Sequence, residues 1–159
     1  MNLPSILLWG FLATLVLTSL MSAAQGLGIT RISVPYLVGT MFTPDRRRAW
    51  LAGMAIHFLN GWIFAIVYAL VFESLGEAGW WRGLLLGTLH GLAVLIVLMP
   101  LMPHMHPRMA DDRQGPVPTW SLEPPGFLAL HYGRRTPIVT ALAHSLYGLV
   151  LGLFYQIAP

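Results

Sequence analysis

The chain has 159 residues, of which 56% are apolar and only 9% are charged, whereas about one quarter of the residues in ordinary globular proteins are charged. The charged side chains are nine Arg and six Asp or Glu, since the sequence contains no Lys. This composition excludes a water-soluble enzyme and a disordered regulator, and it predicts an integral membrane protein.

Four stretches of the sequence lack Asp, Glu and Arg, at residues 1–30, 49–72, 83–107 and 136–159. Each is longer than the roughly 20 residues that cross a bilayer. We therefore predict one all-α transmembrane domain over residues 1–159, a four-helix bundle with spans at about residues 6–26, 50–72, 81–102 and 137–157. The first apolar run resembles a signal peptide, but no Lys or Arg precedes it, so we expect a true first span.

The segments between the spans are predicted not to cross the membrane. Residues 32–42 are apolar but too short, and we expect them to lie along the interface or to continue the first span after a break before Pro35. The short connection at residues 73–80 predicts that the second and third spans are antiparallel neighbours. Residues 111–125 are rich in proline and are predicted to form an irregular loop.

The arginines are sorted by loop. Four lie between the first and second spans and four between the third and fourth, whereas only Arg82 lies near the remaining connection. The positive-inside rule places both Arg-rich loops in the cytoplasm and both termini outside. The arginines form no patch that suits nucleic acid, so we predict contact with the lipid bilayer and no nucleic-acid partner.

The two halves of the chain share a pattern of polar and small residues. Because each half holds two helices, the copies have the same orientation, and we predict a tandem parallel repeat with halves at residues 6–72 and 81–157. His57, Gly61 and Tyr68 recur at equal spacing as His144, Gly148 and Tyr155, and Gln25-Gly26 before Pro35 recurs as His90-Gly91 before Pro100.

Small residues also recur at every fourth position along the leading span of each half, so they form one stripe on each helix. The stripes are Gly10, Thr14, Thr18, Ser22 and Gly26 in the first half and Gly83, Gly87 and Gly91 in the second. Helices in lipid associate by close approach of their backbones at such residues. We expect the stripes to face the bundle or another copy of the protein.

Three of the six histidines, His57, His90 and His144, fall within predicted spans. Polar side chains inside a membrane usually face the bundle interior, where they bind a ligand or one another. From the helical rise, these imidazoles lie roughly 10–15 Å below the cytoplasmic boundary. With Gln25 they are predicted to form one intramembrane layer.

Tyr68 and Tyr155 are predicted as additional hydrogen-bond donors to that layer. Histidines on facing helices can hold the iron of haem b, and three neutral imidazoles can hold copper or zinc. The same groups can bind a quinone carbonyl. Alternatively, each His bonds to a carbonyl, Tyr or Gln on a neighbouring helix and only stabilises the bundle. No carboxylate lies deep within a span, which disfavours a carboxylate proton relay or a di-iron site.

A weaker candidate metal site lies in residues 99–109. Thioether and imidazole ligands suit Cu(I), although prolines end the predicted helix here and Met commonly fills space at such ends. The candidate ligands are Met99, Met102, His104, Met105, His106 and Met109.

We therefore predict a binding protein in membrane electron transfer that uses the histidine layer to hold haem, a transition metal or a quinone. The alternative is a non-catalytic accessory or scaffolding subunit that packs through its small-residue faces against a larger membrane complex or against itself. A small transporter is less favoured, because the spans hold no deep charge. No nucleophile elbow, phosphate loop or nucleotide fingerprint is present, and no Cys is available, so no catalytic residue is predicted.

Four short motifs carry a resemblance that covers most of the chain. They are GTMFTP at residues 39–44, HFLNG at 57–61, HP at 106–107 and HSLYG at 144–148. In these motifs the chain resembles small four-span bacterial membrane proteins of unknown function. The resemblance implies four spans in a bacterial cytoplasmic membrane, which an Arg-only set of basic residues also fits, and it implies no activity.

Overall fold

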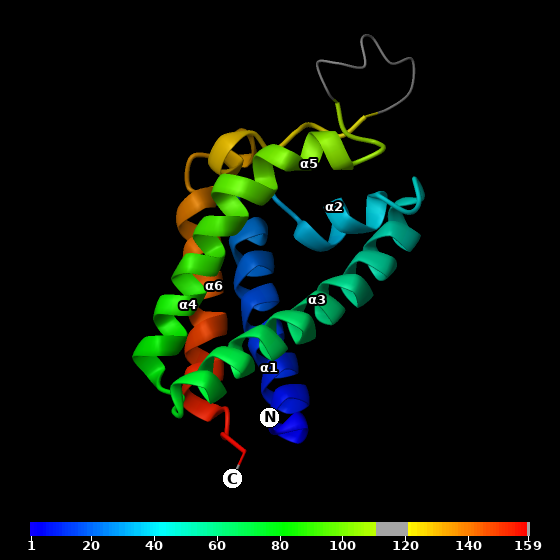
Figure 1. The fold of residues 1–159 in the computed structure, drawn as a ribbon. Coiled ribbons are helices and arrows are strands. Elements are labelled where there is room, and N and C mark those ends of the chain that lie inside the picture. The colour runs from blue at the N-terminus through cyan, green and yellow to red at the C-terminus, as the bar shows by residue number, and fades with distance from the viewer. Residues whose placement is uncertain (111–120, 159) are drawn as a thin grey trace.

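The computed structural model describes residues 1–110 and 121–158 (Figure 1). Within them, four helical stretches are long and apolar enough to cross a membrane. They are α1 (Leu3–Gly26), α3 (Arg46–Leu75), the continuous stretch Trp80–Met105 and α6 (Thr136–Phe154). This confirms the predicted all-α fold with four apolar helices, and it makes the protein a multi-pass membrane protein in contact with lipid.

The helices α1 and α3 begin before their predicted spans because a side chain just ahead of each caps its first turn, whereas α6 ends at Phe154, before the predicted end at residue 157. The Asn2 side chain accepts a hydrogen bond from the Ser5 N–H at the start of α1, as an N-cap does. The Asp45 side chain accepts one from the Arg48 N–H, at 2.7 Å, at the start of α3. That helix ends at Gly76, whose φ of 72° is the left-handed conformation that favours glycine.

The third stretch changes its helical type halfway along. α4 (Trp80–Ala93) is followed by η1 (Val94–Leu98), a wide π-helical turn, and by α5 (Met99–Met105). Pro100 has no N–H and its ring would clash with the carbonyl four residues earlier, so a wider turn accommodates it. The Met99 N–H accordingly bonds to the Val94 carbonyl. The chain stays helical to Met105, past the predicted end at residue 102.

The packing partners differ from the expected ones. α4 packs along α6, and α1 packs against both α6 and α3. The expected side-by-side pairing of the second and third spans is wrong, because the backbones of α3 and α4 diverge from their short connection (Figure 1). α3 packs instead against α2 (Val34–Thr40), a separate short helix that does not continue α1.

Glycines set the α4–α6 pairing. A Cβ on Gly87 would overlap the His144 carbonyl oxygen, and one on Gly83 would overlap the Gly148 carbonyl oxygen. Gly83, Gly87 and Gly91 are all buried, so the expectation that this stripe faces the bundle is confirmed.

The small-residue stripe of α1 is buried along only part of its length. A Cβ on Gly61 of α3 would overlap the Thr14 side chain, and one on Gly10 would lie 2.8 Å from the Ala65 Cβ. Ser22 and Gly26 are exposed, and a Cβ on Gly26 would meet no atom within 4 Å. The stripe therefore docks α1 on α3 through its first half and leaves its second half open.

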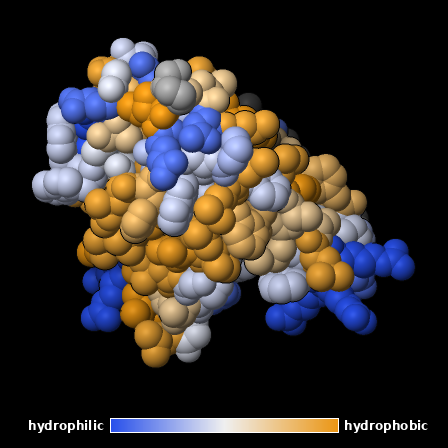
Figure 2. Space-filling model, turned by 90° about the horizontal axis from the view of Figure 1, so that it is seen from below, coloured by the Kyte–Doolittle hydropathy of each residue, from blue (hydrophilic) through white to orange (hydrophobic). Residues whose placement is uncertain are grey.

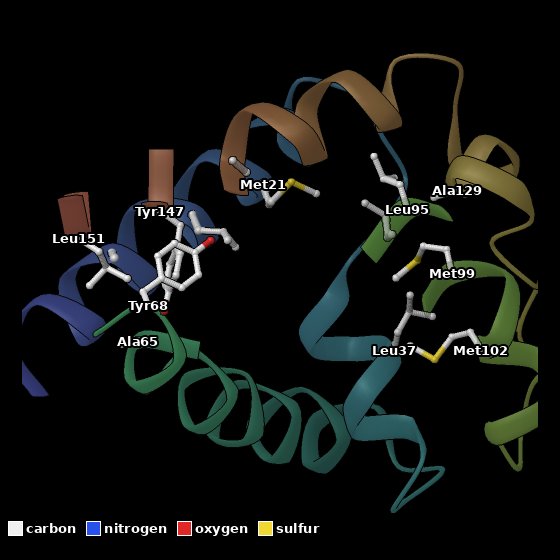
Figure 3. Packing of buried hydrophobic residues seen from close by; sticks show 14 of the residues in the cluster. Met21, Leu37, Ala65, Tyr68, Leu95, Met99, Met102, Ala129, Tyr147 and Leu151 are labelled. Atoms are coloured by element: carbon white, nitrogen blue, oxygen red, sulfur yellow. The ribbon is translucent and has the colours of Figure 1, made fainter. Parts of the chain in front are cut away.

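The buried apolar residues form one cluster that runs along the bundle. Figure 3 shows this cluster as two groups, one of aromatic and aliphatic side chains and one rich in methionine. Met21 lies between the two groups. The first group includes Ala65, Tyr68, Tyr147 and Leu151, and the second includes Leu37, Leu95, Met99, Met102 and Ala129. Seen from the end that holds both termini, Figure 2 shows a broad hydrophobic surface interrupted by separate groups of hydrophilic residues.

Two predictions fall beyond these observations. Most of the predicted loop at residues 111–125 lies outside the described residues; in its described part, residues 121–125, Leu122 forms an isolated β-bridge with Met109. The tandem repeat stays a prediction.

Candidate functional site

A cavity of about 200 Å³ lies within the bundle. Side chains of α1, α2, α3 and α6 line it, together with those of α4, η1, α5 and η2 (Phe127–Tyr132). Most of the lining is apolar. The polar lining residues are Thr14, Thr18, Ser22, Gln25, Ser33, His57, Asn60, His90, Thr140 and His144.

Four of the six residues predicted for the histidine layer line this cavity, namely Gln25, His57, His90 and His144. Tyr68 lies beside it, with its hydroxyl 3.4 Å from Nδ1 of His90. Tyr155 lies elsewhere.

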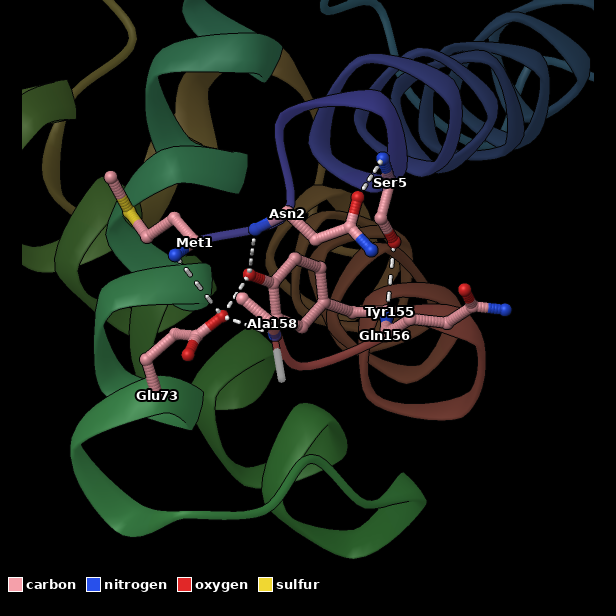
Figure 4. A network of polar contacts seen from close by, with 7 residues as sticks. All are labelled: Met1, Asn2, Ser5, Glu73, Tyr155, Gln156 and Ala158. Atoms are coloured by element: carbon pink, nitrogen blue, oxygen red, sulfur yellow. Dashed lines mark hydrogen bonds and ion pairs between the residues drawn. The ribbon is translucent and has the colours of Figure 1, made fainter.

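Tyr155 follows the last residue of α6, at the end of the molecule that holds both termini (Figure 4). Its hydroxyl donates a 2.6 Å hydrogen bond to Glu73. The equal spacing of Tyr68 and Tyr155 from their histidines therefore does not give the two tyrosines equivalent surroundings.

His90 and His144 form the centre of the site. Their ring centroids are 4.8 Å apart in an edge-to-face arrangement. Phe64 reaches across from α3, with its ring centroid 3.9 Å from that of His90. The helices α3 and α4 thus contact each other at this level through side chains, although their backbones diverge.

The hydrogen bonds of the rings indicate which nitrogen has no partner among the described residues. Nδ1 of His144 lies 2.8 Å from the Thr140 carbonyl oxygen, so Nδ1 carries the proton and donates it. In a neutral imidazole, Nε2 is then an acceptor. The Tyr68 hydroxyl can donate to Nδ1 of His90, which leaves Nε2–H of that ring as a donor. No described residue forms a hydrogen bond with the His57 ring.

Thr140 adds a polar group that the sequence pattern did not single out. The residue is 4% exposed and lines the cavity. Its hydroxyl oxygen is the one buried side-chain nitrogen or oxygen atom, among those described, that lacks a hydrogen-bond partner. Buried hydroxyls are nearly always hydrogen-bonded, so a polar atom of a bound molecule would be stabilised at this position.

The geometry disfavours haem and a transition metal. Within residues 1–110 and 121–158, no three His, Cys, Asp or Glu side chains lie close enough together to hold a metal ion. Two axial imidazoles must lie on opposite faces of a porphyrin, whereas the rings of His90 and His144 touch each other. The cavity is also smaller than the roughly 300–1,000 Å³ of pockets for drug-sized ligands. It suits a single-ring molecule.

The six candidate ligands at residues 99–109 divide between the core and the surface. Met99, Met102 and Met109 are buried in the apolar cluster, whereas His104 and Met105 are exposed. His106 is buried, and its Nε2 lies 2.9 Å from the Leu37 carbonyl oxygen and 3.2 Å from the Thr40 hydroxyl.

His106 and Arg108 together cap the end of α2. Nη1 of Arg108 donates to the carbonyl oxygens of Thr40 and Met41, at 2.7 and 3.1 Å. The last carbonyls of a helix lack partners within it, so both residues have a structural role. The sequence gives no local signal for this cap, because His106 and Arg108 are 66 and 68 positions from Thr40 and only the tertiary fold brings them together.

Comparison of the chain with protein-family models, with curated proteins and with solved structures gave no match, in agreement with a resemblance that names no family.

Proposed function

We propose that the protein binds a quinone-like molecule, a single apolar ring that carries carbonyl or hydroxyl oxygens, inside its membrane-spanning bundle. One observation carries this proposal: three imidazoles and the unpartnered Thr140 hydroxyl meet at one largely apolar cavity of about 200 Å³. A mostly apolar lining with a few polar groups is typical of sites for small molecules.

The rings of His90 and His144 suit both redox forms of such a ligand. Nε2–H of His90 can donate to a quinone carbonyl, and Nε2 of His144 can accept from a quinol hydroxyl. The Thr140 hydroxyl can do either. Interconversion of the two forms takes two electrons and two protons from redox partners, so we assign ligand binding to this chain and place it beside such partners in membrane electron transfer.

The divergence of α3 and α4 gives an apolar tail a route to the lipid. Phe64 of α3 and Leu98 of η1 both line the cavity and are also 38% and 39% exposed. A ligand with an isoprenoid tail can therefore keep its ring among the histidines and its tail in the bilayer.

Binding of a short-tailed benzoquinone to the purified protein in detergent tests the proposal. Trp50 lines the cavity, so quenching of tryptophan fluorescence reports the dissociation constant. We expect saturable binding that His144→Ala and His90→Ala each weaken at least tenfold, about 1.4 kcal/mol. Thr140→Val, which keeps the side-chain shape, should weaken it less.

The matched control is His104→Ala, because that histidine is exposed and lies outside the cavity. Equal affinity in all four variants would remove the case for a quinone site. A Soret band or a stoichiometric metal in the wild-type protein, lost in His144→Ala, would instead support the haem or metal alternative.

The scaffolding alternative stays a prediction, but its surface must be revised. Gly83, Gly87 and Gly91 are buried against α6 of the same chain, so they are not available to another protein. Association with a larger complex or a second copy would have to use other surface, of which the open second half of the α1 stripe at Ser22 and Gly26 is the small-residue part.

A further inference from the structure

A second hollow of about 630 Å³ lies at the Arg-rich end of the molecule, outside the histidine-lined cavity. We name it the arginine groove and define it by the residues Gln25, Ser33, Tyr36, Arg46, Arg47 and Trp50, which line it. Gln25 lies at the end of α1, Ser33 directly before α2 and Tyr36 within α2. The other three residues belong to the first turns of α3.

The two guanidinium groups of the arginine groove take part in no ion pair within residues 1–110 and 121–158. The ion pairs of the described residues involve Glu73, Glu77 and Glu123, and none of them reaches Arg46 or Arg47. The neighbouring acid, Asp45, is engaged as the helix cap through its bond with the Arg48 N–H. Guanidinium groups match phosphate oxygens in charge and in their planar pairs of N–H donors.

The position of the groove favours a phosphate that belongs to a lipid. Arg46 and Arg47 begin a helix long and apolar enough to cross the membrane, and Trp50 lies one turn further along it, where an interfacial aromatic residue is expected. The arginine groove also shares Gln25, Ser33 and Trp50 with the largely apolar cavity. A headgroup in the groove therefore has apolar surface directly beside it for the start of an acyl chain.

We infer that the arginine groove binds the headgroup of an anionic phospholipid, with the phosphate between Arg46 and Arg47 and with the hydroxyls of Ser33 and Tyr36 as additional donors. The positive-inside rule places this lipid in the cytoplasmic leaflet. The inference does not depend on what occupies the histidine-lined cavity.

Native mass spectrometry of the delipidated protein, titrated with phosphatidylglycerol and with phosphatidylcholine, tests the inference. We expect one phosphatidylglycerol to bind more tightly than phosphatidylcholine. The double variant Arg46→Gln/Arg47→Gln should weaken phosphatidylglycerol binding roughly thirtyfold, since each Arg near an anionic lipid surface contributes a factor of about five.

The matched control is Arg134→Gln/Arg135→Gln, which removes the same charge from exposed positions at the same end of the molecule. It should leave the affinity for phosphatidylglycerol within about twofold of the wild-type value. Equal weakening by both double variants would show diffuse attraction and overturn the site. Equal binding of the two lipids, or displacement of phosphatidylglycerol by inorganic phosphate at matched concentration, would overturn the assignment to an anionic lipid.

Discussion

Tyr147 connects two helices that otherwise have few contacts. Its hydroxyl donates a 2.6 Å hydrogen bond to the Gly61 carbonyl oxygen, which joins α6 to α3. Its ring stands edge-to-face on that of Tyr68, with 5.5 Å between centroids, and the residue is only 2% exposed. The bond therefore holds α3 against the bundle close to the histidine-lined cavity.

We expect Tyr147→Phe to lower the free energy of unfolding by about 1 kcal/mol, the net value of one such hydrogen bond. Thermal unfolding in detergent measures the change. The control is Tyr36→Phe, because no described residue bonds to the Tyr36 hydroxyl and its loss should have a much smaller effect. An unchanged melting temperature for Tyr147→Phe would show that the bond contributes nothing to stability.

At the scale of the helices, close contact between backbones holds α4 and α6 together. The hydrophobic effect does not drive helices together within lipid, so their association depends on close packing at residues without side chains. Gly83 and Gly87 supply it on α4, and Gly148 and Gly152 supply it on α6. A methyl group at any of these positions meets backbone atoms, which cannot rotate away.

We expect Gly87→Ala to destabilise the protein by about 2 kcal/mol or more, in the upper part of the range for overpacked cores. Gly26→Ala is the matched control, because Gly26 also lies in a helix and nothing surrounds its position. That change should be neutral or slightly stabilising, since alanine favours helix over glycine. Chemical unfolding in mixed micelles compares the two, and similar effects would contradict the glycine-mediated packing of α4 on α6.

Across the whole molecule, the two ends differ in charge and in how they are held. At the end with both termini, Glu73 accepts hydrogen bonds from the Tyr155 hydroxyl and the Ala158 N–H, at 2.6 and 3.0 Å, and the Tyr155 hydroxyl accepts one from the Asn2 N–H (Figure 4). In the nearby turn, a hydrogen bond from Arg82 and its positive charge lower the pKa of Glu77. This end therefore holds Glu73 and Glu77 with Arg82 as its one arginine, whereas the other eight arginines belong to the two loops at the opposite end.

The absence of cysteine makes the sidedness of the ends straightforward to measure. We expect Glu77→Cys to react with a membrane-impermeant maleimide in intact cells, because the positive-inside rule places that end outside. Arg134→Cys, at the opposite end, should react only after the membrane is permeabilised. The unmodified sequence, which has no Cys, provides the background, and the reverse labelling pattern would invert the predicted topology.

The fold could be predicted from the sequence because lipid tolerates so few charged residues. The charge-free stretches located all four apolar helices, whereas their ends were misjudged where Asp45 and Gly76 extend α3 beyond its apolar part. The partners of α3 could not be predicted, because a short connection fixes where two helices start and not the angle between them.

The histidines of the candidate site could be predicted, because helical spacing decides which face of a helix a residue occupies. His57, His90 and His144 each lie on an inward face of their helix, and all three line one cavity. Thr140 was missed because an unpartnered hydroxyl is a property of three-dimensional surroundings. Tyr155 was included on spacing alone, yet it follows the end of α6, where the helical register no longer applies.

The inclination of α3 has a consequence for how the protein responds to its membrane. The charge-free part of α3, residues 49–72, is about 36 Å long, which exceeds the roughly 30 Å of a hydrocarbon layer, and an inclined helix accommodates this difference. A thicker bilayer allows α3 to stand more upright, which on the proposed function narrows the tail route between Phe64 and Leu98. Ligand release should therefore be slower in long-chain than in short-chain phosphatidylcholine nanodiscs, a dependence that stopped-flow fluorescence can follow directly.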